Sequence, residues 1–213
     1  MMKTKLVSIL WFLSLLFWLP SCSKNDTATV MPIGEEEYIE DILSVVSDLA
    51  FWTDFGSYDD GPIPPDIQGK YLMAPKLRIS TNVAGLPQQL VEPNLDLCFS
   101  RQHNGIAVME LNETTETLTD TVFVRGSGNV FTAYFIEEKS TELTFPDAVY
   151  HVHIKRGVIM KGRVSDAGLS DFRMATVILE AEDDSQGVLE QYPPGSYFIY
   201  KDADGLVKRM DES

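Results

Sequence analysis

Cysteine is scarce in this 213-residue sequence, which holds only Cys22 and Cys98. A chain of this length buries a core without disulfides to hold it together. Cys98 lies in residues 95–99, where apolar residues alternate with small or polar ones as in a β-strand. We expect Cys98 to be a small core residue; the alternative is a reactive thiol, which needs a base nearby.

Basic residues are also few. The sequence has 17 lysines and arginines against 32 aspartates and glutamates, which gives a net charge of −15. Surfaces that bind nucleic acid or anionic lipid need a basic footprint, so the composition argues against nucleic acid as a partner. The plainest interpretation of the acidity is solubility, and binding of a cation or a basic partner is the alternative.

The sequence lacks a motif that indicates an enzyme. Gly126-Ser127-Gly128 does not have the glycine spacing of a nucleophile elbow, and no lysine with serine or threonine follows it as in a phosphate loop. Asp202-Ala203-Asp204-Gly205 resembles part of a calcium loop, but Leu206 and Arg209 stand where oxygen ligands belong. A hairpin turn accounts for it, and we expect no catalysis and no cofactor.

Only three histidines are present. His151 and His153 are two apart on an expected strand and therefore share a face, which suits metal ligands, with His103 as a third. The residues that alternate with them are apolar: Tyr150, Val152 and Ile154. We therefore expect the histidine pair to face solvent and to bind no metal, with a metal site as the alternative.

Long apolar runs are limited to residues 6–19, which follow Lys3 and Lys5 and end at Pro20. A secretory signal needs ~7–15 apolar residues, whereas a membrane-spanning helix needs ~18–20. The run fits the first length and falls short of the second. The sequence therefore predicts a signal peptide over residues 1–21.

Leu19-Pro20-Ser21-Cys22 resembles the lipobox of bacterial lipoproteins, in which the cysteine is acylated and the chain is cut before it. Leu19 and Ser21 fit the pattern, and Pro20 departs from it. The resemblance implies a lipid, such as palmitate, at Cys22, which leaves Cys98 without an intrachain disulfide partner. Two or three acyl chains give a stable membrane anchor. An ordinary secretory signal with an incidental cysteine is the alternative.

The residues after Cys22 resemble a sorting signal. Ser23-Lys24-Asn25-Asp26 is similar to the lysine-plus-acid signal of Bacteroidetes surface lipoproteins, although Asn25 stands where an acid is usual. The resemblance implies the bacterial cell envelope, with the protein anchored to the outer membrane and either periplasmic or surface-exposed. A plain solvated tether over residues 22–34 is the alternative.

Residues 35–68 divide into a helix and a connector. In residues 35–52 apolar side chains recur at helical spacing, and Glu35, Glu36 and Glu37 suit a helix N-terminus. We expect one amphipathic helix, docked on the domain because its polar face is acidic, whereas membrane-surface helices prefer a basic one. Residues 53–68 are rich in glycine and proline and predict a loop.

Residues 69–213 have no helical repeat and predict an all-β domain. Hairpin turns are expected at 103–105, 126–128, 156–157 and 202–205, with a broken or bulged strand at Pro75. The predicted strands are 71–83, 95–102, 106–111, 118–125, 129–137, 148–155, 158–165, 172–182, 197–201 and 206–210. Sequential hairpins favour an antiparallel meander of about 8–10 strands that closes into a barrel. A two-sheet β-sandwich is the alternative.

Residues 130–136 are apolar on both faces, so we expect the helix to cover the outer face. The inner face would line the interior together with aromatic residues: Phe123, Phe172, Phe198 and Tyr200. Either side chains fill that interior, or it holds a small apolar ligand.

Gly69-Lys70-Tyr71, at the start of the first strand, resembles the Gly-x-Trp opening of lipocalins. Tyr71 replaces the tryptophan, no disulfide pair exists, and the family's usual basic residue has no clear counterpart. The resemblance implies a lipocalin-like barrel that binds a small or apolar ligand. The alternative is a structural or protein-interaction module of an envelope complex, with a solid core.

Overall fold

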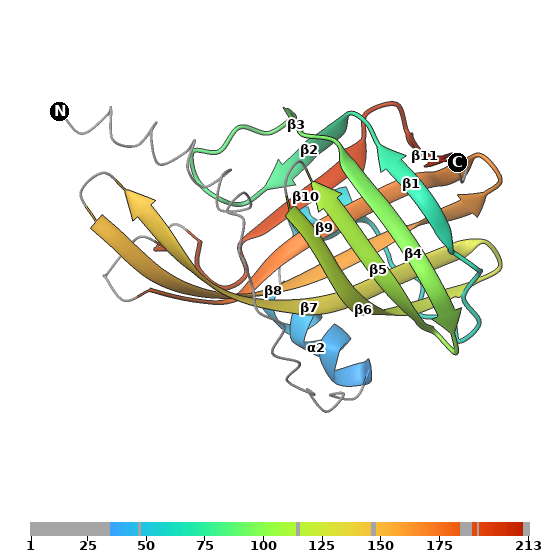
Figure 1. Cartoon of the computed structure of the whole chain (residues 1–213), viewed down its shortest axis with the longest axis horizontal. Helices are drawn as coiled ribbons and strands as arrows, with labels where there is room; N and C mark the ends of the chain where they lie inside the picture. The colour runs from blue at the N-terminus through green and yellow to red at the C-terminus, as the bar shows by residue number, and fades with distance from the viewer. Residues whose placement is uncertain are drawn as a thin grey trace.

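The structure is a computed structural model that describes residues 35–46, 48–113, 116–145, 148–183, 189–190 and 192–210 (Figure 1). Two helices come first, α2 (Glu35–Val45) and α3 (Leu49–Phe55). The strands follow in this order: β1 (Gly69–Met73), β2 (Lys76–Thr81), β3 (Leu90–Glu92), β4 (Leu95–His103), β5 (Ile106–Glu113), β6 (Glu116–Ser127), β7 (Val130–Phe145), β8 (Ala148–Ser165), β9 (Gly168–Asp183), β10 (Tyr197–Asp202) and β11 (Leu206–Met210). The predicted all-β class is confirmed.

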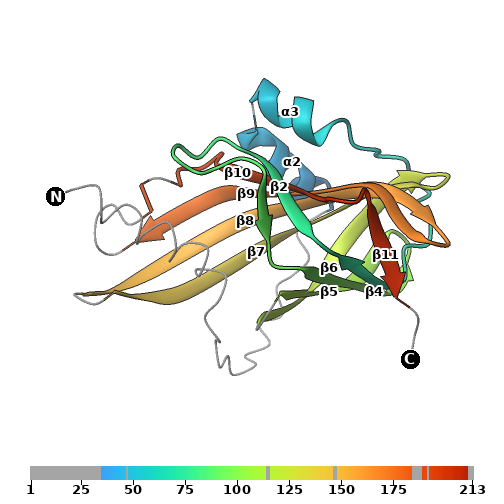
Figure 2. The ribbon, with the colours of Figure 1, turned by 90° about the horizontal axis from the view of Figure 1, so that it is seen from above.

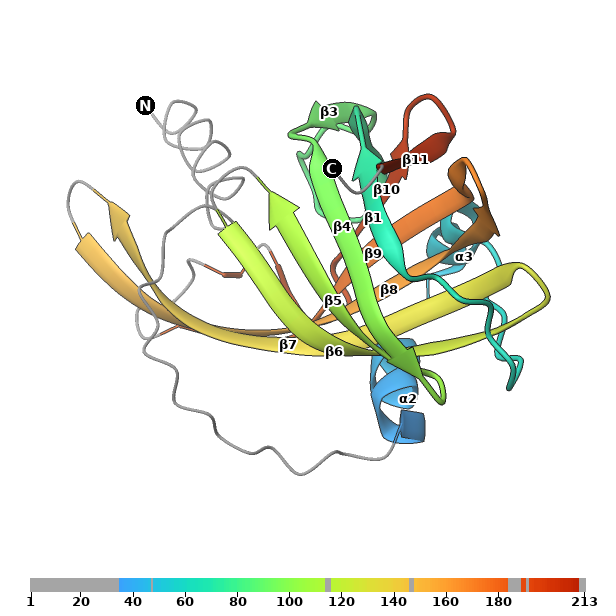
Figure 3. The same ribbon diagram turned by 45° about the vertical axis from the view of Figure 1, so that its right-hand side comes forward.

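The strands form a single antiparallel sheet in the order β11-β1-β4-β5-β6-β7-β8-β9-β10-β2-β3. An additional pairing of β11 with β9 closes a ring of eight strands, β1, β4–β9 and β11. Beyond the part paired with β11, β9 pairs with β10, so β10, β2 and β3 continue the sheet. Figure 3 shows the barrel-like result, which is one curved sheet rather than a sandwich of two.

Two of the four expected hairpins are confirmed. Asn104 and Gly105 have φ of 51° and 75°, and they join β4 to β5 as the Asn-Gly signal predicts. The second hairpin joins β6 to β7, with its turn after Ser127. The break at Pro75 separates β1 from β2. The hairpin expected at 202–205 is wrong, because β10 pairs with β9 and β2 whereas β11 pairs with β1 and β9. A turn that joins two different neighbours of β9 stands there instead, and it follows Asp202, which ends β10. The Asp202 carboxylate accepts hydrogen bonds from the N–H groups of Asp204 and Ala74, each at 2.9 Å.

The predicted hairpin at 156–157 is wrong. β8 runs without interruption through both residues, and its pairing with β7 extends to Phe145 and Ala148. Gly157 serves a different purpose, since a Cβ there would lie 2.4 Å from Cγ1 of Ile42 on α2. Glycine therefore allows the helix to approach the strand. The resulting long hairpin extends beyond the other strands in Figure 1.

The single helix predicted for residues 35–52 is two helices. Asp48 lies between them in an extended conformation, and its carboxylate accepts a hydrogen bond of 2.8 Å from the N–H of Ala50. An aspartate at this position caps the start of α3, which ends at Phe55 rather than at residue 52. The short strand β3 lies between the predicted strands 71–83 and 95–102, and it is a second element that the sequence pattern did not indicate.

Both helices cover the outer face of the sheet, as Figure 2 shows. Ile42, Val46, Phe51 and Phe55 form one buried cluster with Tyr134 and other outward residues of β7–β10. The prediction that helix covers the outer face of residues 130–136 is therefore confirmed. The apolar sequence of residues 130–136 is thus explained, because both faces of β7 are buried here.

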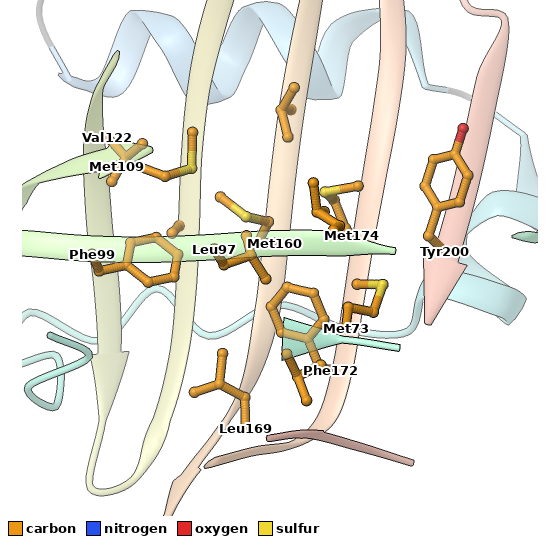
Figure 4. Packing of buried hydrophobic residues seen from close by; sticks show 14 of the residues in the cluster. Met73, Leu97, Phe99, Met109, Val122, Met160, Leu169, Phe172, Met174 and Tyr200 are labelled. Carbon is orange, nitrogen blue, oxygen red and sulfur yellow. The ribbon is translucent and has the colours of Figure 1, made fainter. Parts of the chain in front are cut away.

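The inner face forms a second buried cluster, shown in Figure 4. Phe172, Phe198 and Tyr200 belong to it, as predicted. Phe123 does not: it packs on the outer side, stacked on Tyr134 with ring centroids 5.8 Å apart. Its neighbours Val122 and Val124 point inward, and alternation along the strand therefore turns Phe123 outward.

Candidate functional site

The inner face of β2 is charged. Lys76, Arg78 and Ser80 alternate with Leu77 and Ile79, and they are the buried members, with only 3% of Lys76 and 6% of Arg78 exposed. Ile79 packs against the cluster beneath the helices, which fixes the orientation of the strand. The register therefore directs two cations inward, where buried charges need partners.

Two glutamates supply those partners. Glu92 on β3 forms an ion pair with Lys76, with Nζ 3.3 Å from Oε2, and lies beside Arg78, with Nε 3.5 Å from Oε1. Lys76 also donates to Glu113 at the end of β5. β2 and β5 are not neighbours in the sheet, so the Lys76–Glu113 pair joins two separate parts of it. We call Lys76, Arg78, Glu92 and Glu113 the inner ion cluster.

Aromatic rings from β10 complete the surroundings of the two cations. Nζ of Lys76 lies 4.8 Å from the ring centroid of Tyr200, and Cζ of Arg78 lies 5.8 Å from that of Phe198. Burial, reinforced by Glu92, raises the pKa of Tyr200 well above its usual value. Burial also raises the pKa of Tyr192 to about 12, against the opposing effect of Arg78. Both phenols therefore stay neutral and can donate hydrogen bonds.

Arg78 is the least satisfied member of the inner ion cluster. Its Nε is buried and makes no hydrogen bond, because the contact with Glu92 does not have hydrogen-bond geometry. A buried N–H without an acceptor is unfavourable and uncommon in folded proteins. The guanidinium therefore has a donor available toward the interior of the domain.

A second charged group lies further round the inner face. Arg156 on β8 donates to Glu137 on β7, and Asp120 on β6 shares the face of Val122. Burial raises the pKa of Asp120 from 3.8 to about 6, against the Thr121 N–H that lowers it and with Glu137 adding to the rise. The carboxyl group of Asp120 is therefore stabilised by the fold in its neutral form.

Asp120→Asn is expected to stabilise the protein at neutral pH only. Because folding raises this pKa from 3.8 to about 6, the folded chain retains a proton that the unfolded chain loses, and stability falls as pH rises through this window. Allowing for partial exposure, we expect a gain of about 1 kcal/mol near pH 7.5 and almost none near pH 3, below both pKa values. Urea unfolding at both pH values measures it. The exposed Asp171→Asn is the control, and an equal gain at both pH values would contradict the assignment.

A hollow of about 240 Å³ lies outside the ring, beside α2. It is lined by Ile39, Tyr58, Asp59, Asp60, Arg125, Thr132 and Tyr134. Asp59 is occupied within the fold, because its carboxylate accepts hydrogen bonds of 2.8 Å from the Gly61 N–H and the Ser127 hydroxyl. The carboxylate of Asp59 therefore supports the wall of the hollow.

The cysteines and histidines named as candidates from the sequence do not belong to the inner ion cluster. Cys22 is outside the described residues. Cys98 is half-buried on the face of β4 opposite Leu97 and Phe99, so its predicted core position is wrong. His151 and His153 flank the buried Val152 and share a face, as expected. His151 is exposed, but His153 is only half-exposed, with Nδ1 3.0 Å from the Ser140 hydroxyl.

His103 ends β4 and is exposed. Within the described ranges, no group of three or more histidine, cysteine, aspartate or glutamate side chains is arranged to hold a metal ion. No helix in the same part of the chain has the length and apolar character needed to cross a membrane.

Sequence reasoning missed Lys76, Arg78, Glu92 and Glu113. Their alternation with apolar residues is visible along β2, but in isolation it predicts that the cations face solvent. Only the helices, which cover the side of Leu77 and Ile79, reverse that expectation. The sequence signal for these inward-facing charges is the combination of an amphipathic N-terminal helix with a strand that offers the helix an apolar face to pack on.

Comparison with protein-family models, with curated proteins and with solved structures finds no match to this chain. The fold and the site therefore define its class: an all-β protein whose antiparallel sheet closes a barrel-like ring of eight strands. Its interior combines an apolar cluster with buried charges.

Proposed function

We propose that the β domain binds a small, largely apolar ligand on the inner face of its curved sheet. The observation that carries this proposal is the inner ion cluster, where lysine and arginine are buried beside an apolar interior. A solid structural core gains little from buried ion pairs, because desolvation offsets their attraction. Binding sites, by contrast, combine apolar walls with a few polar groups that orient the ligand.

The apolar part of the interior also suits a ligand. Four of the eight methionines in the sequence, Met73, Met109, Met160 and Met174, belong to the inner cluster. Methionine side chains are flexible and adapt to ligands of different shape. Figure 4 shows them beside Phe99 and Phe172, with the hydroxyl of Tyr200 directed away from Leu169. This arrangement offers an apolar region with a polar group at one side.

Tyr71 adds support for a lipocalin-like protein. Its ring is buried at the start of β1, and Cζ of Arg209 on β11 lies 5.8 Å from the ring centroid. Arg209 also donates a hydrogen bond of 3.0 Å to the carbonyl of Gln68. Arg209 is thus the candidate for the basic residue that the resemblance requires and the sequence alone did not identify.

We further propose that a lipid on Cys22 holds the domain at the bacterial outer membrane. The support is the predicted signal peptide with its lipobox-like end, and the polar residues 23–34 would serve as the tether. Metabolic labelling with palmitate tests the anchor, and a chain that remains unlabelled in its own host would refute it.

Ligand binding is tested with the predicted mature chain, residues 22–213, carrying Cys22→Ser so that no acyl chain is attached. We expect N-phenyl-1-naphthylamine, an uncharged apolar dye, to bind with enhanced fluorescence. Ala107→Trp should abolish binding, because Ala107 points into the inner cluster. Val108→Trp, one residue along on the opposite face, should leave it unchanged.

Circular dichroism checks that both variants fold, and Ala107→Leu is the smaller substitute if tryptophan prevents folding. If the dye does not bind to the parent chain, or binds equally to the Ala107 and Val108 variants, the interior holds no ligand. The domain would then be a solid structural or protein-interaction module of the envelope.

A further inference from the structure

The cations on the inner face differ in how completely they are paired with carboxylates. Lys76 contacts two carboxylates, those of Glu92 and Glu113, and Arg156 binds Glu137. Arg78 shares Glu92 with Lys76, and its buried Nε makes no hydrogen bond. Among the described residues, Arg78 is therefore the inner cation whose charge and donors are least satisfied.

The surroundings of Arg78 favour an acceptor from outside the chain. The guanidinium lies over the ring of Phe198, whose centroid is 6.4 Å from that of Tyr192. Phe198 offers no hydrogen-bond acceptor, and the neutral phenols of Tyr192 and Tyr200 can donate hydrogen bonds to an anion. Arginine presents a planar fork of N–H groups that matches a carboxylate with two parallel hydrogen bonds.

A cationic ligand is the competing possibility, because Asp120 also faces the interior. Burial raises the pKa of the Asp120 carboxyl group, however, which favours its neutral form and weakens its attraction for a cation. Glu92, Glu113 and Glu137 already contact Lys76 or Arg156. Of the charged groups near the apolar β10 residues, Arg78 is the one with an N–H donor that has no acceptor. Its positive charge favours a negatively charged ligand.

We infer that the ligand has an anionic head group of the carboxylate class and that Arg78 binds it, with the apolar remainder among the inner methionines. This inference rests on the proposed function, which supplies the interior site. It makes Arg78 a specificity-determining residue rather than only a member of a structural ion cluster.

Three probes of equal chain length test the inference by displacement of N-phenyl-1-naphthylamine: dodecanoate, dodecanol and dodecylamine, each below its micellar concentration. The parent chain is expected to bind dodecanoate at least about tenfold more tightly than dodecanol, as a charge-assisted hydrogen-bonded pair predicts. Arg78→Met should remove this preference and leave dodecanol affinity unchanged. Arg78→Lys, which keeps the charge but not the fork, should retain part of it.

Arg163→Met is the matched control, because Arg163 is half exposed and pairs at the surface with Asp171, 3.3 Å away. It should keep the full preference for dodecanoate. Equal binding of dodecanoate and dodecanol, tighter binding of dodecylamine, or a preference that survives Arg78→Met would each overturn the assignment while leaving the interior site intact. Failure of the dye itself to bind would reject both proposals together. Unchanged dodecanol affinity in Arg78→Met excludes a general loss of folding.

Discussion

Replacing Lys76 with methionine is expected to lower the free energy of unfolding by about 3 kcal/mol, at the lower end of the cost of breaking a buried ion pair. The methionine fills most of the space but leaves Glu92 and Glu113 without the ammonium between them. Both carboxylates are partly exposed, at 19% and 23%, which keeps the loss below that of a fully enclosed pair. Urea unfolding followed by circular dichroism measures it.

Two further variants separate this effect from a general loss of charge. Lys155→Met removes one partner of the more exposed Lys155–Glu180 pair, whose Nζ and Oε1 are 3.0 Å apart, and should cost less than about 1 kcal/mol. Lys76→Met combined with Glu113→Gln should recover part of the loss, since one of the two stranded charges is gone. Equal costs for the Lys76 and Lys155 variants would show that the inner ion cluster contributes nothing special to stability.

The contrast between β7 and β2 shows which parts of this fold are readable from sequence. Residues 130–136 are apolar on both faces, and this is enough to predict a strand covered on both sides. β2 alternates cations with Leu77 and Ile79, a pattern that in isolation predicts that the cations face solvent, although either set of residues can face inward. The choice depends on where the helices dock, which is a tertiary contact between residues distant in sequence. The inner ion cluster, built from β2, β3 and β5, could therefore not be predicted from the sequence.

Two glycines show the same difference between local and tertiary information. Asn104-Gly105 is a local signal, because both residues adopt positive φ and the turn needs nothing else. Gly157 resembles a turn glycine in sequence, but its φ lies outside the left-handed region and it continues β8. What makes glycine necessary there is the side chain of Ile42, which belongs to another element. A local pattern gives no access to that contact.

Gly157→Ala is accordingly expected to destabilise the protein by about 2 kcal/mol, as overpacking in a closed core does. The added Cβ would lie 2.4 Å from Cγ1 and 3.0 Å from Cδ1 of Ile42, a β-branched side chain with little freedom to move on a helix. Either α2 shifts outward or Ile42 changes rotamer, and both loosen the cluster that includes Tyr134.

A double-mutant cycle with Ile42→Ala identifies the cause. Ile42→Ala alone should cost about 2–5 kcal/mol, because it leaves a cavity under the helix. In that background the alanine at 157 has room, so its own cost should fall to near zero or become a gain. If the two costs simply add, the alanine acts on the strand backbone rather than on the helix. The close approach of α2 to β8 would then not be the reason for glycine at position 157.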